Sequence, residues 1–155
     1  MSLHRETFTA LVRGMKWTRG AELGVDKGIL FGMLLRECPD LHLIGVDLFP
    51  DRLRSSRAFD YAARWADRSK LIEGDTVSAA SHVADRSLDF VFIDADHSYT
   101  SVRKDIEAWR SKVKPGGWLG GHDYNHKFPG VVRAVDFAFG RSVITLPGSI
   151  WSVAA

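Results

Sequence analysis

Short apolar runs alternate with segments of helical periodicity along most of the chain. The apolar runs occupy residues 21–24, 41–46, 70–74, 88–93 and 117–121. Between them, apolar side chains recur at helical spacing, as at Ile29, Leu30, Met33 and Leu34. Strands that alternate with helices in this way form a mostly parallel sheet, because each helix returns the chain to the edge where the next strand starts. Right-handed crossovers then place helices on both faces, which predicts a doubly wound α/β fold.

The helical segments and the end of the chain complete the expected order. Helices are expected over residues 5–17, 28–37, 51–66, 76–83, 99–113 and 131–139. Pro115-Gly116 is expected to close the helix over 99–113. Two final apolar runs, 143–146 and 150–154, are joined by Pro147-Gly148, and so short a connection predicts an antiparallel hairpin. The expected sheet therefore has seven strands.

Length and composition exclude several classes of protein. A chain of 155 residues with 45% hydrophobic side chains forms one packed domain without a metal or disulfide staple. Its net charge of +2 lacks the concentrated basic footprint of a nucleic-acid-binding protein. No apolar run approaches the roughly 20 residues that span a bilayer. Cys38 is the only cysteine, so no intrachain disulfide forms, and we expect a protein of the reducing cytoplasm.

The first expected strand ends in a glycine turn that discriminates between nucleotide cofactors. A dinucleotide fingerprint needs glycines at positions 26 and 29, where pyrophosphate approaches the backbone. This chain has Asp26 and Ile29 there, and a carboxylate repels a phosphate. The spacing Glu22-x-Gly24-x-x-x-Gly28 instead suits an uncharged adenosine with a small amino-acid tail, the build of S-adenosylmethionine. A plain strand-to-helix turn at Gly24 explains the same spacing equally well.

Acidic residues follow the second and third expected strands. Asp47 comes 23 residues after Gly24, near the interval at which an acidic side chain meets ribose hydroxyls. Asp75 is placed to accept a hydrogen bond from the adenine amine. Each residue has an alternative role as the cap of the helix that follows it. The two carboxylates therefore either bind the nucleoside or cap helices.

Five motifs together resemble those of class I S-adenosylmethionine-dependent methyltransferases. They are Glu22-Leu23-Gly24, Gly45-Val46-Asp47, Phe92-Ile93-Asp94-Ala95-Asp96-His97-Ser98-Tyr99, Lys114-Pro115-Gly116-Gly117 and Gly121-His122-Asp123-Tyr124. The chain is most similar to the bacterial branch of metal-dependent sugar O-methyltransferases and cephalosporin-hydroxylase-like proteins. The resemblance implies a Rossmann-like, seven-stranded sheet with an antiparallel last strand. It also implies a single methyltransferase domain over residues 1–155.

The resemblance implies roles for individual residues. The expected cofactor-binding residues are Glu22, Gly24, Gly28, Asp47, Leu48, Asp75, Thr76 and Asp94. His97 matches the catalytic base. Asp94 and Asp123 match the ligands of a divalent metal, magnesium or manganese, and His122 is a further candidate ligand. Relatives with a metal site often carry an acidic pair where this chain has His122-Asp123, and this departure puts the metal in question.

Methyl transfer to a hydroxyl explains why such residues are needed. An alcohol or phenol becomes a good nucleophile only when its proton is removed or its pKa is lowered. His97 would remove the proton, and a cation between Asp94 and Asp123 would lower the pKa. His122 suits manganese, iron or zinc better than magnesium. In the alternative interpretation, Asp94 binds only the cofactor amine and His97 is a loop residue.

We therefore expect an enzyme that methylates a hydroxyl of a small molecule, with neither nucleic acid nor membrane as a partner. The alternatives are a cofactor-binding domain without catalysis of its own and a metal-independent methyltransferase of another acceptor atom. Tyr124, Phe128 and Trp151 are candidates for an aromatic acceptor pocket, although such residues more often belong to a core. Few residues remain for a lid, so the acceptor site is expected to be open or to be closed by a second subunit of a homo-oligomer.

Overall fold

The computed structural model of the chain describes residues 2–154. Its elements in chain order are α1 (Leu3–Met15), β1 (Arg19–Leu23), α2 (Ile29–Glu37), β2 (His42–Asp47), α3 (Ser56–Arg64), β3 (Ser69–Glu73), α4 (Thr76–Ala79), η1 (Ala80–His82), β4 (Leu88–Ile93), α5 (Tyr99–Arg110), β5 (Val113–Gly121), α6 (Pro129–Phe139), η2 (Gly140–Ser142), β6 (Ile144–Leu146) and β7 (Ile150–Ala154). Every predicted strand and every predicted helix has a counterpart in this order.

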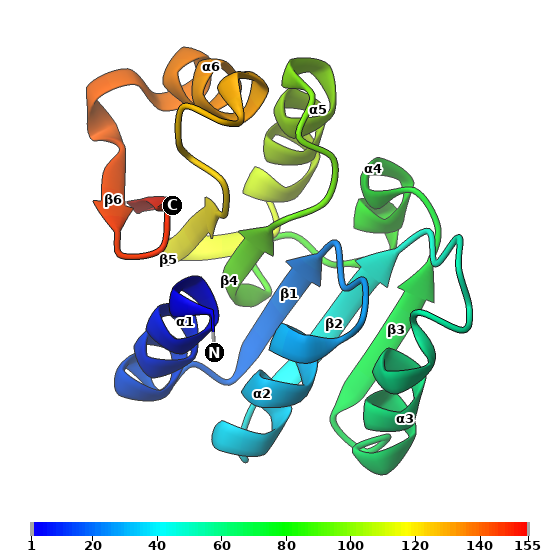
Figure 1. Cartoon of the computed structure of the whole chain (residues 1–155). Coiled ribbons are helices and arrows are strands. Elements are labelled where there is room, and N and C mark those ends of the chain that lie inside the picture. Colours follow the sequence, from blue (N-terminus) through cyan, green and yellow to red (C-terminus); the bar gives the residue numbers. More distant parts are fainter. Residues whose placement is uncertain (1, 155) are drawn as a thin grey trace.

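The strands form one seven-stranded sheet in the order β3-β2-β1-β4-β5-β7-β6. Strands β1 to β5 are parallel, whereas β7 is antiparallel to both of its neighbours, β5 and β6. The predicted doubly wound fold and the predicted hairpin are therefore confirmed. The strand order reverses between β1 and β4, which is where ligands bind in sheets of this kind. Figure 1 shows that β1, β2, β3 and β4 all point toward the same edge.

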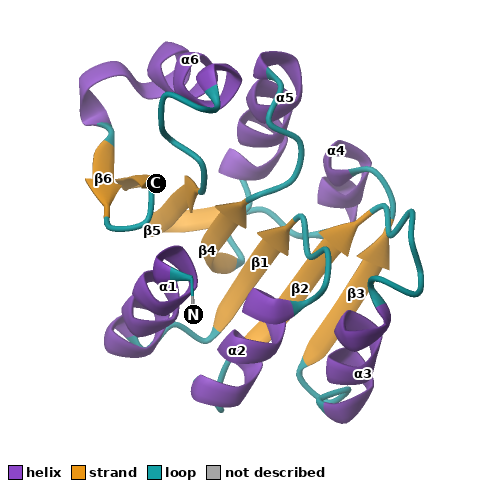
Figure 2. Ribbon diagram, in the orientation of Figure 1, coloured by secondary structure: helices purple, strands orange, loops and turns teal. Residues whose placement is uncertain are grey.

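Helices cover both faces of the sheet (Figure 2). On one face α1, α2 and α3 bury an apolar layer that includes Phe8, Phe31 and Phe90. On the other face α4, α5 and α6 bury a second layer, in which Trp109 is fully buried. Because both faces are covered, the central strand Leu88–Ile93 is almost continuously apolar.

Strand β5 starts earlier than the sequence predicts, and the helix before it ends earlier. Helix α5 ends at Arg110, and Val113 already pairs with Leu88 of β4. Pro115-Gly116 therefore lies inside β5, and the prediction that it closes the helix is wrong. The five-residue step from Val113 to Trp118 runs beside a two-residue step of β4, so the segment with the proline bulges out of the ladder. A bulge tolerates a residue that has no N–H to donate.

Helices α3 and α4 are shorter than the predicted 51–66 and 76–83. Before α3 the chain forms a turn in which Oδ1 of Asp51 accepts a hydrogen bond from the N–H of Arg54, 3.0 Å away. Helix α4 has a single turn and continues as the 3₁₀ helix η1. Among residues 2–154, no helix combines the length and the apolarity needed to cross a membrane.

Candidate active site

Two adjoining cavities lie at the edge where the parallel strands end. The α1 cavity has a volume of about 330 Å³ and is lined by residues that include His4, Arg5, Glu22, Lys27 and His97. The α4 cavity has a volume of about 420 Å³ and is lined by residues that include Asp47, Leu48, Asp75, Thr76 and Asp105. Gly24, Asp26, Asp94 and Ala95 line both. The two cavities thus bring together most of the residues that the motifs single out.

Gly24 forms the turn between the two cavities. Its φ of +87° is a conformation that other residues rarely adopt, and a Cβ there would lie 2.1 Å from the carbonyl oxygen of Asp94. The end of β1 can approach the end of β4 only because residue 24 has no side chain. Close backbone packing therefore requires this glycine whether or not a ligand passes over it.

Asp47 holds the two loops that border the α4 cavity. Its Oδ2 accepts a hydrogen bond from the N–H of Asp26, and its Oδ1 accepts one from the N–H of Phe49, both at 2.8 Å. The next residue, Leu48, is 65% exposed beside the cavity. Each carboxylate oxygen can accept a second hydrogen bond, so positioning of the loops leaves Asp47 free to bind a ligand as well.

Asp75 and Thr76 form the start of α4 at the wall of the same cavity. Asp75 caps the helix, because its Oδ1 accepts from the N–H of Ser78 at 2.9 Å. These hydrogen bonds lower the pKa of Asp75. The hydroxyl of Thr76 donates to Oδ1 of Asp105, 2.5 Å away, and Asp105 is only 2% exposed. The sequence left two roles open for Asp75, the helix cap and the adenine contact, and the structure shows the helix cap.

Glu22 is a buried carboxyl group at the wall of the α1 cavity. It is 2% exposed, and its Oε2 has no hydrogen-bond partner among the described residues. Burial raises the pKa of Glu22 well above its ordinary value, and the nearby charge of Asp94 adds to the effect. An unpaired buried carboxyl group costs free energy, which a cationic ligand in the cavity would recover.

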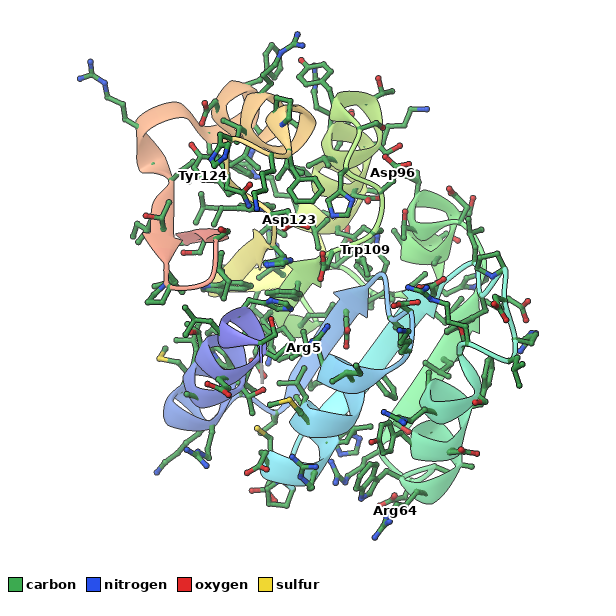
Figure 3. The ribbon with its side chains drawn as sticks, viewed as in Figure 1. Arg5, Arg64, Asp96, Trp109, Asp123 and Tyr124 are labelled. Atoms are coloured by element: carbon green, nitrogen blue, oxygen red, sulfur yellow. The ribbon has the colours of Figure 1, made fainter. Side chains whose placement is uncertain are left out.

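His97 lies between two carboxylates at the ends of β4 and β5. Its Nε2 is 2.7 Å from Oδ2 of Asp123 and 3.8 Å from Oδ1 of Asp94. Asp94 raises the pKa of His97, and Asp123 adds to the effect while burial opposes it. Figure 3 shows Asp123 and Tyr124 in the segment between β5 and α6, and Asp96 in the segment before α5. Carboxylates from two neighbouring strand ends thus lie beside one imidazole.

His122 lies on the other side of Asp94 and is accompanied by a histidine that the sequence did not single out. Nδ1 of His122 is 3.5 Å from Oδ1 of Asp94, and its ring centroid is 3.7 Å from that of His4 in α1. Burial alone would raise the pKa of Asp94, but the imidazoles of His122 and His97 lower it below its ordinary value. Burial and the neighbouring His122 lower the pKa of His4 to about 4.

The predicted metal ligands belong to two overlapping groups rather than one. Asp94, His97 and Asp123 each offer a ligand atom, and these atoms lie within 4.8 Å of one another. Asp94, His122 and His4 form a second such group. Asp94 is common to both. No sequence motif marks His4, because α1 reaches the site only through packing on the sheet.

Other predicted residues lie farther from the cavities. Gly28 begins α2 in a left-handed conformation, and a Cβ there would lie 2.6 Å from Cα of Ala58 in α3, so Gly28 serves helix packing. Trp151 is fully buried in the core. Phe128 stacks near His97 with ring centroids 4.6 Å apart, and the hydroxyl of Tyr124 donates to Asp136 at 2.6 Å. Among the three aromatic candidates, Phe128 has a ring contact with His97, the predicted catalytic residue.

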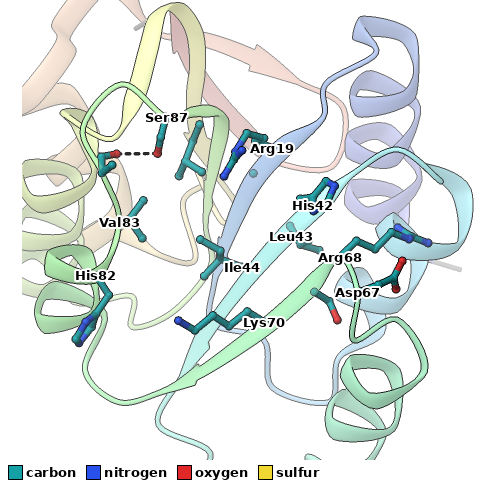
Figure 4. A pocket seen from close by; sticks show the side chains of 14 residues that line it. Arg19, His42, Leu43, Ile44, Asp67, Arg68, Lys70, His82, Val83 and Ser87 are labelled. Carbon is teal, nitrogen blue, oxygen red and sulfur yellow. Dashed lines mark hydrogen bonds between the residues drawn. The ribbon is translucent and has the colours of Figure 1, made fainter.

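A further cavity of about 320 Å³ lies at the opposite edge of the sheet. Its walls come from the first residues of β1, β2 and β3, among them Arg19, His42 and Lys70, and from His82 in η1 (Figure 4). None of the residues that the motifs single out lines it. The candidate cofactor-binding and catalytic residues therefore lie at the carboxyl edge of the sheet and not at this cavity.

Comparison with known proteins assigns the chain to a family. A family model described as a methyltransferase domain matches residues 21–124, a stretch that runs from β1 to the end of the Gly-His-Asp-Tyr motif. The chain belongs to this methyltransferase family. It is a class I S-adenosylmethionine-dependent methyltransferase, as its motifs predict. No curated protein matches the chain by sequence.

Solved structures have the same fold. A Staphylococcus aureus protein described as a candidate caffeoyl-CoA O-methyltransferase has a TM-score of 0.77 and 16% identity, over 98% of this chain and 83% of the other. The O-methyltransferase TomG from Streptomyces achromogenes, solved with S-adenosylmethionine, has a TM-score of 0.73 and 18% identity, over 95% and 77%. An O-methyltransferase from Bacillus cereus, solved with SAH, has a TM-score of 0.70 and 18% identity, over 95% and 78%.

Proposed function

We propose that this methyltransferase transfers the methyl group of S-adenosylmethionine to a hydroxyl oxygen of a small molecule, with His97 as the general base. The observation that carries the proposal is the position of His97 beside the α1 cavity, with its Nε2 2.7 Å from Asp123. The structural neighbours that are named O-methyltransferases support an oxygen acceptor. A nucleic acid or a membrane is not needed as a partner under this proposal.

The two cavities suit the two halves of the cofactor. The α4 cavity, with Asp47 and Asp75 on its wall, would hold the adenosine, and Leu48 and Thr76 would border it. The α1 cavity would hold the amino-acid tail, because the unpaired carboxyl group of Glu22 matches an ammonium group. Gly24 and Asp94 line both cavities and would lie beside the sulfonium. Gly28 would act indirectly, by fixing α2 against α3.

The chemical step requires a base next to the acceptor hydroxyl. As the acceptor oxygen bonds to the methyl carbon, the carbon–sulfur bond breaks and its electron pair returns to sulfur. His97 accepts the hydroxyl proton, and the carboxylate of Asp123, whose Oδ2 lies 2.7 Å from Nε2 of His97, stabilises the imidazolium that forms. Phe128 packs against the His97 ring and restricts its motion. No other residue is needed for the proton balance.

A divalent cation would assist the same step. Asp94 and Asp123, with His122 beside them, would hold magnesium or manganese at the ends of β4 and β5. Nδ1 of His122 lies 3.5 Å from Oδ1 of Asp94 and 3.4 Å from Oδ1 of Asp123, close enough for all three side chains to contact one cation. Such a cation would lower the pKa of the acceptor hydroxyl and orient it.

The proposal can be tested by separating cofactor binding from turnover. Calorimetric titration should detect binding of S-adenosylmethionine to the wild type and, with similar affinity, to His97→Ala. Turnover with a library of phenols, sugars and other hydroxyl compounds should fall by about 10²–10⁴-fold in His97→Ala. His126→Ala, in the exposed loop after β5, is the matched control and should keep full turnover.

Three results would contradict the proposal. Absence of cofactor binding would reject the assignment of the cavities. Unchanged turnover in His97→Ala would remove His97 from the mechanism. Full activity after dialysis against a chelator would remove the cation, whereas loss that added magnesium or manganese restores would support it. Tight cofactor binding with no transfer to any acceptor would favour a binding domain without its own catalysis.

A further inference from the structure

His4 is a buried residue of the first turn of α1 that the proposed mechanism does not use. It is 8% exposed and lines the α1 cavity, although 90 residues of sequence separate it from Asp94. The turn between β6 and β7 packs directly behind it, since a Cβ on Gly148 would lie 2.5 Å from the backbone nitrogen of His4. The backbone of His4 is therefore packed against this turn, while the residue lines the cavity at the carboxyl edge of the sheet.

The two nitrogens of the His4 ring are differently occupied. Nδ1 lies 2.8 Å from the hydroxyl oxygen of Ser2, within hydrogen-bond distance. In the tautomer in which Nδ1–H donates to this hydroxyl, the hydrogen bond orients the ring, as around many histidines that bind metals, and the lone pair lies on Nε2. Nε2 of His4 then offers its lone pair as a ligand.

The distances around Asp94 resemble those of a metal site before the ion enters. Nδ1 of His122 is 3.5 Å from Oδ1 of Asp94, and ligand atoms bound at 2.0–2.1 Å to a tetrahedral ion are about 3.3 Å apart. The ligand atoms of His4, Asp94 and His122 all lie within 4.8 Å of one another, so closure around an ion requires movements of at most about 1.5 Å. The tilted stack of the two imidazoles already keeps both rings beside the carboxylate.

We infer that His4, His122 and Asp94 bind a first-row transition-metal ion of the zinc or cobalt class. Two imidazole nitrogens and one carboxylate suit such ions, whereas magnesium prefers a shell of oxygens. The inference deepens the proposed function and rests on it in one respect, because Asp94 and His122 also belong to the proposed cation site. It changes the expected metal and adds a ligand from α1.

An ion at this place would also stabilise α1. It would connect the first turn of α1 to the ends of β4 and β5, where the rings of His4 and His122 already pack together. Amide hydrogen exchange of α1 should therefore slow when zinc is added. Binding of the ion would then also fix the position of α1 beside the α1 cavity.

The test is a cobalt titration of tag-free protein, followed by the visible absorption of Co²⁺ and by competition with Zn²⁺. His4→Phe keeps a ring that can stack on His122 but removes the ligand, and it should weaken Co²⁺ binding by about 10–100-fold or more. His82→Phe, at the exposed opposite edge, is the matched control and should bind Co²⁺ like the wild type. His97→Phe should also retain Co²⁺, because His97 belongs to the other group.

Each outcome decides the inference. Equal Co²⁺ affinity in the wild type and in His4→Phe, or no Co²⁺ binding by the wild type, would overturn it. Loss of Co²⁺ in His97→Phe but not in His4→Phe would place the ion in the other group and would overturn it too. Circular dichroism and urea denaturation of each variant verify folding. A wild type that binds Co²⁺ but no S-adenosylmethionine would sink the proposed function and leave the ion site standing.

Discussion

Replacement of Asp105 by asparagine should stabilise the protein at neutral pH. The carboxyl group of Asp105 is 2% exposed at the wall of the α4 cavity and accepts a 2.5 Å hydrogen bond from Thr76. Burial raises the pKa of Asp105 from 3.8 to about 6, and the negative charges of Asp75 and Asp96 add to this increase. The hydrogen bond from Thr76 lowers the pKa but does not cancel the effect of burial. Above pH 6 the folded protein therefore contains a buried negative charge, and within residues 2–154 no salt bridge compensates it.

The size of the effect follows from the two pKa values. Between pH 3.8 and 6 the folded state holds a proton that the unfolded state has lost, so the free energy of unfolding falls as the pH rises. The loss reaches about 3 kcal/mol above pH 7, because each pKa unit corresponds to about 1.4 kcal/mol. At pH 4 the loss is only about 0.5 kcal/mol. Asparagine has no charge to bury, and its Oδ1 can still accept from Thr76.

Urea denaturation from pH 4 to pH 8, followed by tryptophan fluorescence, measures this difference. The gap between Asp105→Asn and the wild type should widen from about 0.5 to about 3 kcal/mol over that range. The control is Asp85→Asn, since Asp85 is exposed and Lys112 and Ser111 lower its pKa. Its gap should have the opposite sign and be small. A gap for Asp105→Asn that does not change with pH would refute the reasoning.

Two further substitutions examine the walls of the cavities. Gly24→Ala places a Cβ 2.1 Å from a backbone oxygen and should lower the free energy of unfolding by about 3 kcal/mol or more. Gly116→Ala is the control, because Gly116 has a similar φ but open space around it, and it should lower the free energy of unfolding by only about 1 kcal/mol. Equal losses in urea denaturation would show that the close contact at Gly24 does not destabilise the protein. Glu22→Gln should weaken calorimetric binding of S-adenosylmethionine by about tenfold or more and leave adenosine binding unchanged. Equal loss for both ligands would mean that Glu22 does not face the amino-acid tail.

Much of the fold could be predicted from the sequence because the signals are local. Most strands between Ala21 and Gly121 contain a short apolar run, and the intervening helices have a periodicity of their own. In a parallel sheet all carboxyl ends meet at one edge, so recognition of the strands was sufficient to bring Asp47, Asp94 and Asp123 to the same side of the molecule. The family motifs could also be recognised, because each of them is a short continuous stretch of sequence.

The pairing inside β5 could not be predicted in this way. A proline followed by glycine after a helical segment indicates a helix end when only neighbouring residues are considered. Pairing of Val113 with Leu88 of β4 extends the strand back in spite of Pro115, because sheet hydrogen bonds on both sides of the bulge outweigh the local preference.

The detailed arrangement of the site depended on contacts between distant segments. The strand-end motifs placed His97, His122 and Asp94 near one another, but they did not reveal that His97 would join Asp123 while His122 would join His4. His4 comes to the site because the apolar stripe of α1 packs on the sheet and the β6–β7 turn closes behind it. Asp105 acquires its high pKa in the same way, through burial by segments far away in sequence. Periodicity and motifs therefore sufficed for the architecture and the edge that carries the chemistry, whereas ligand grouping and charge states arose from long-range packing that no local signal encodes.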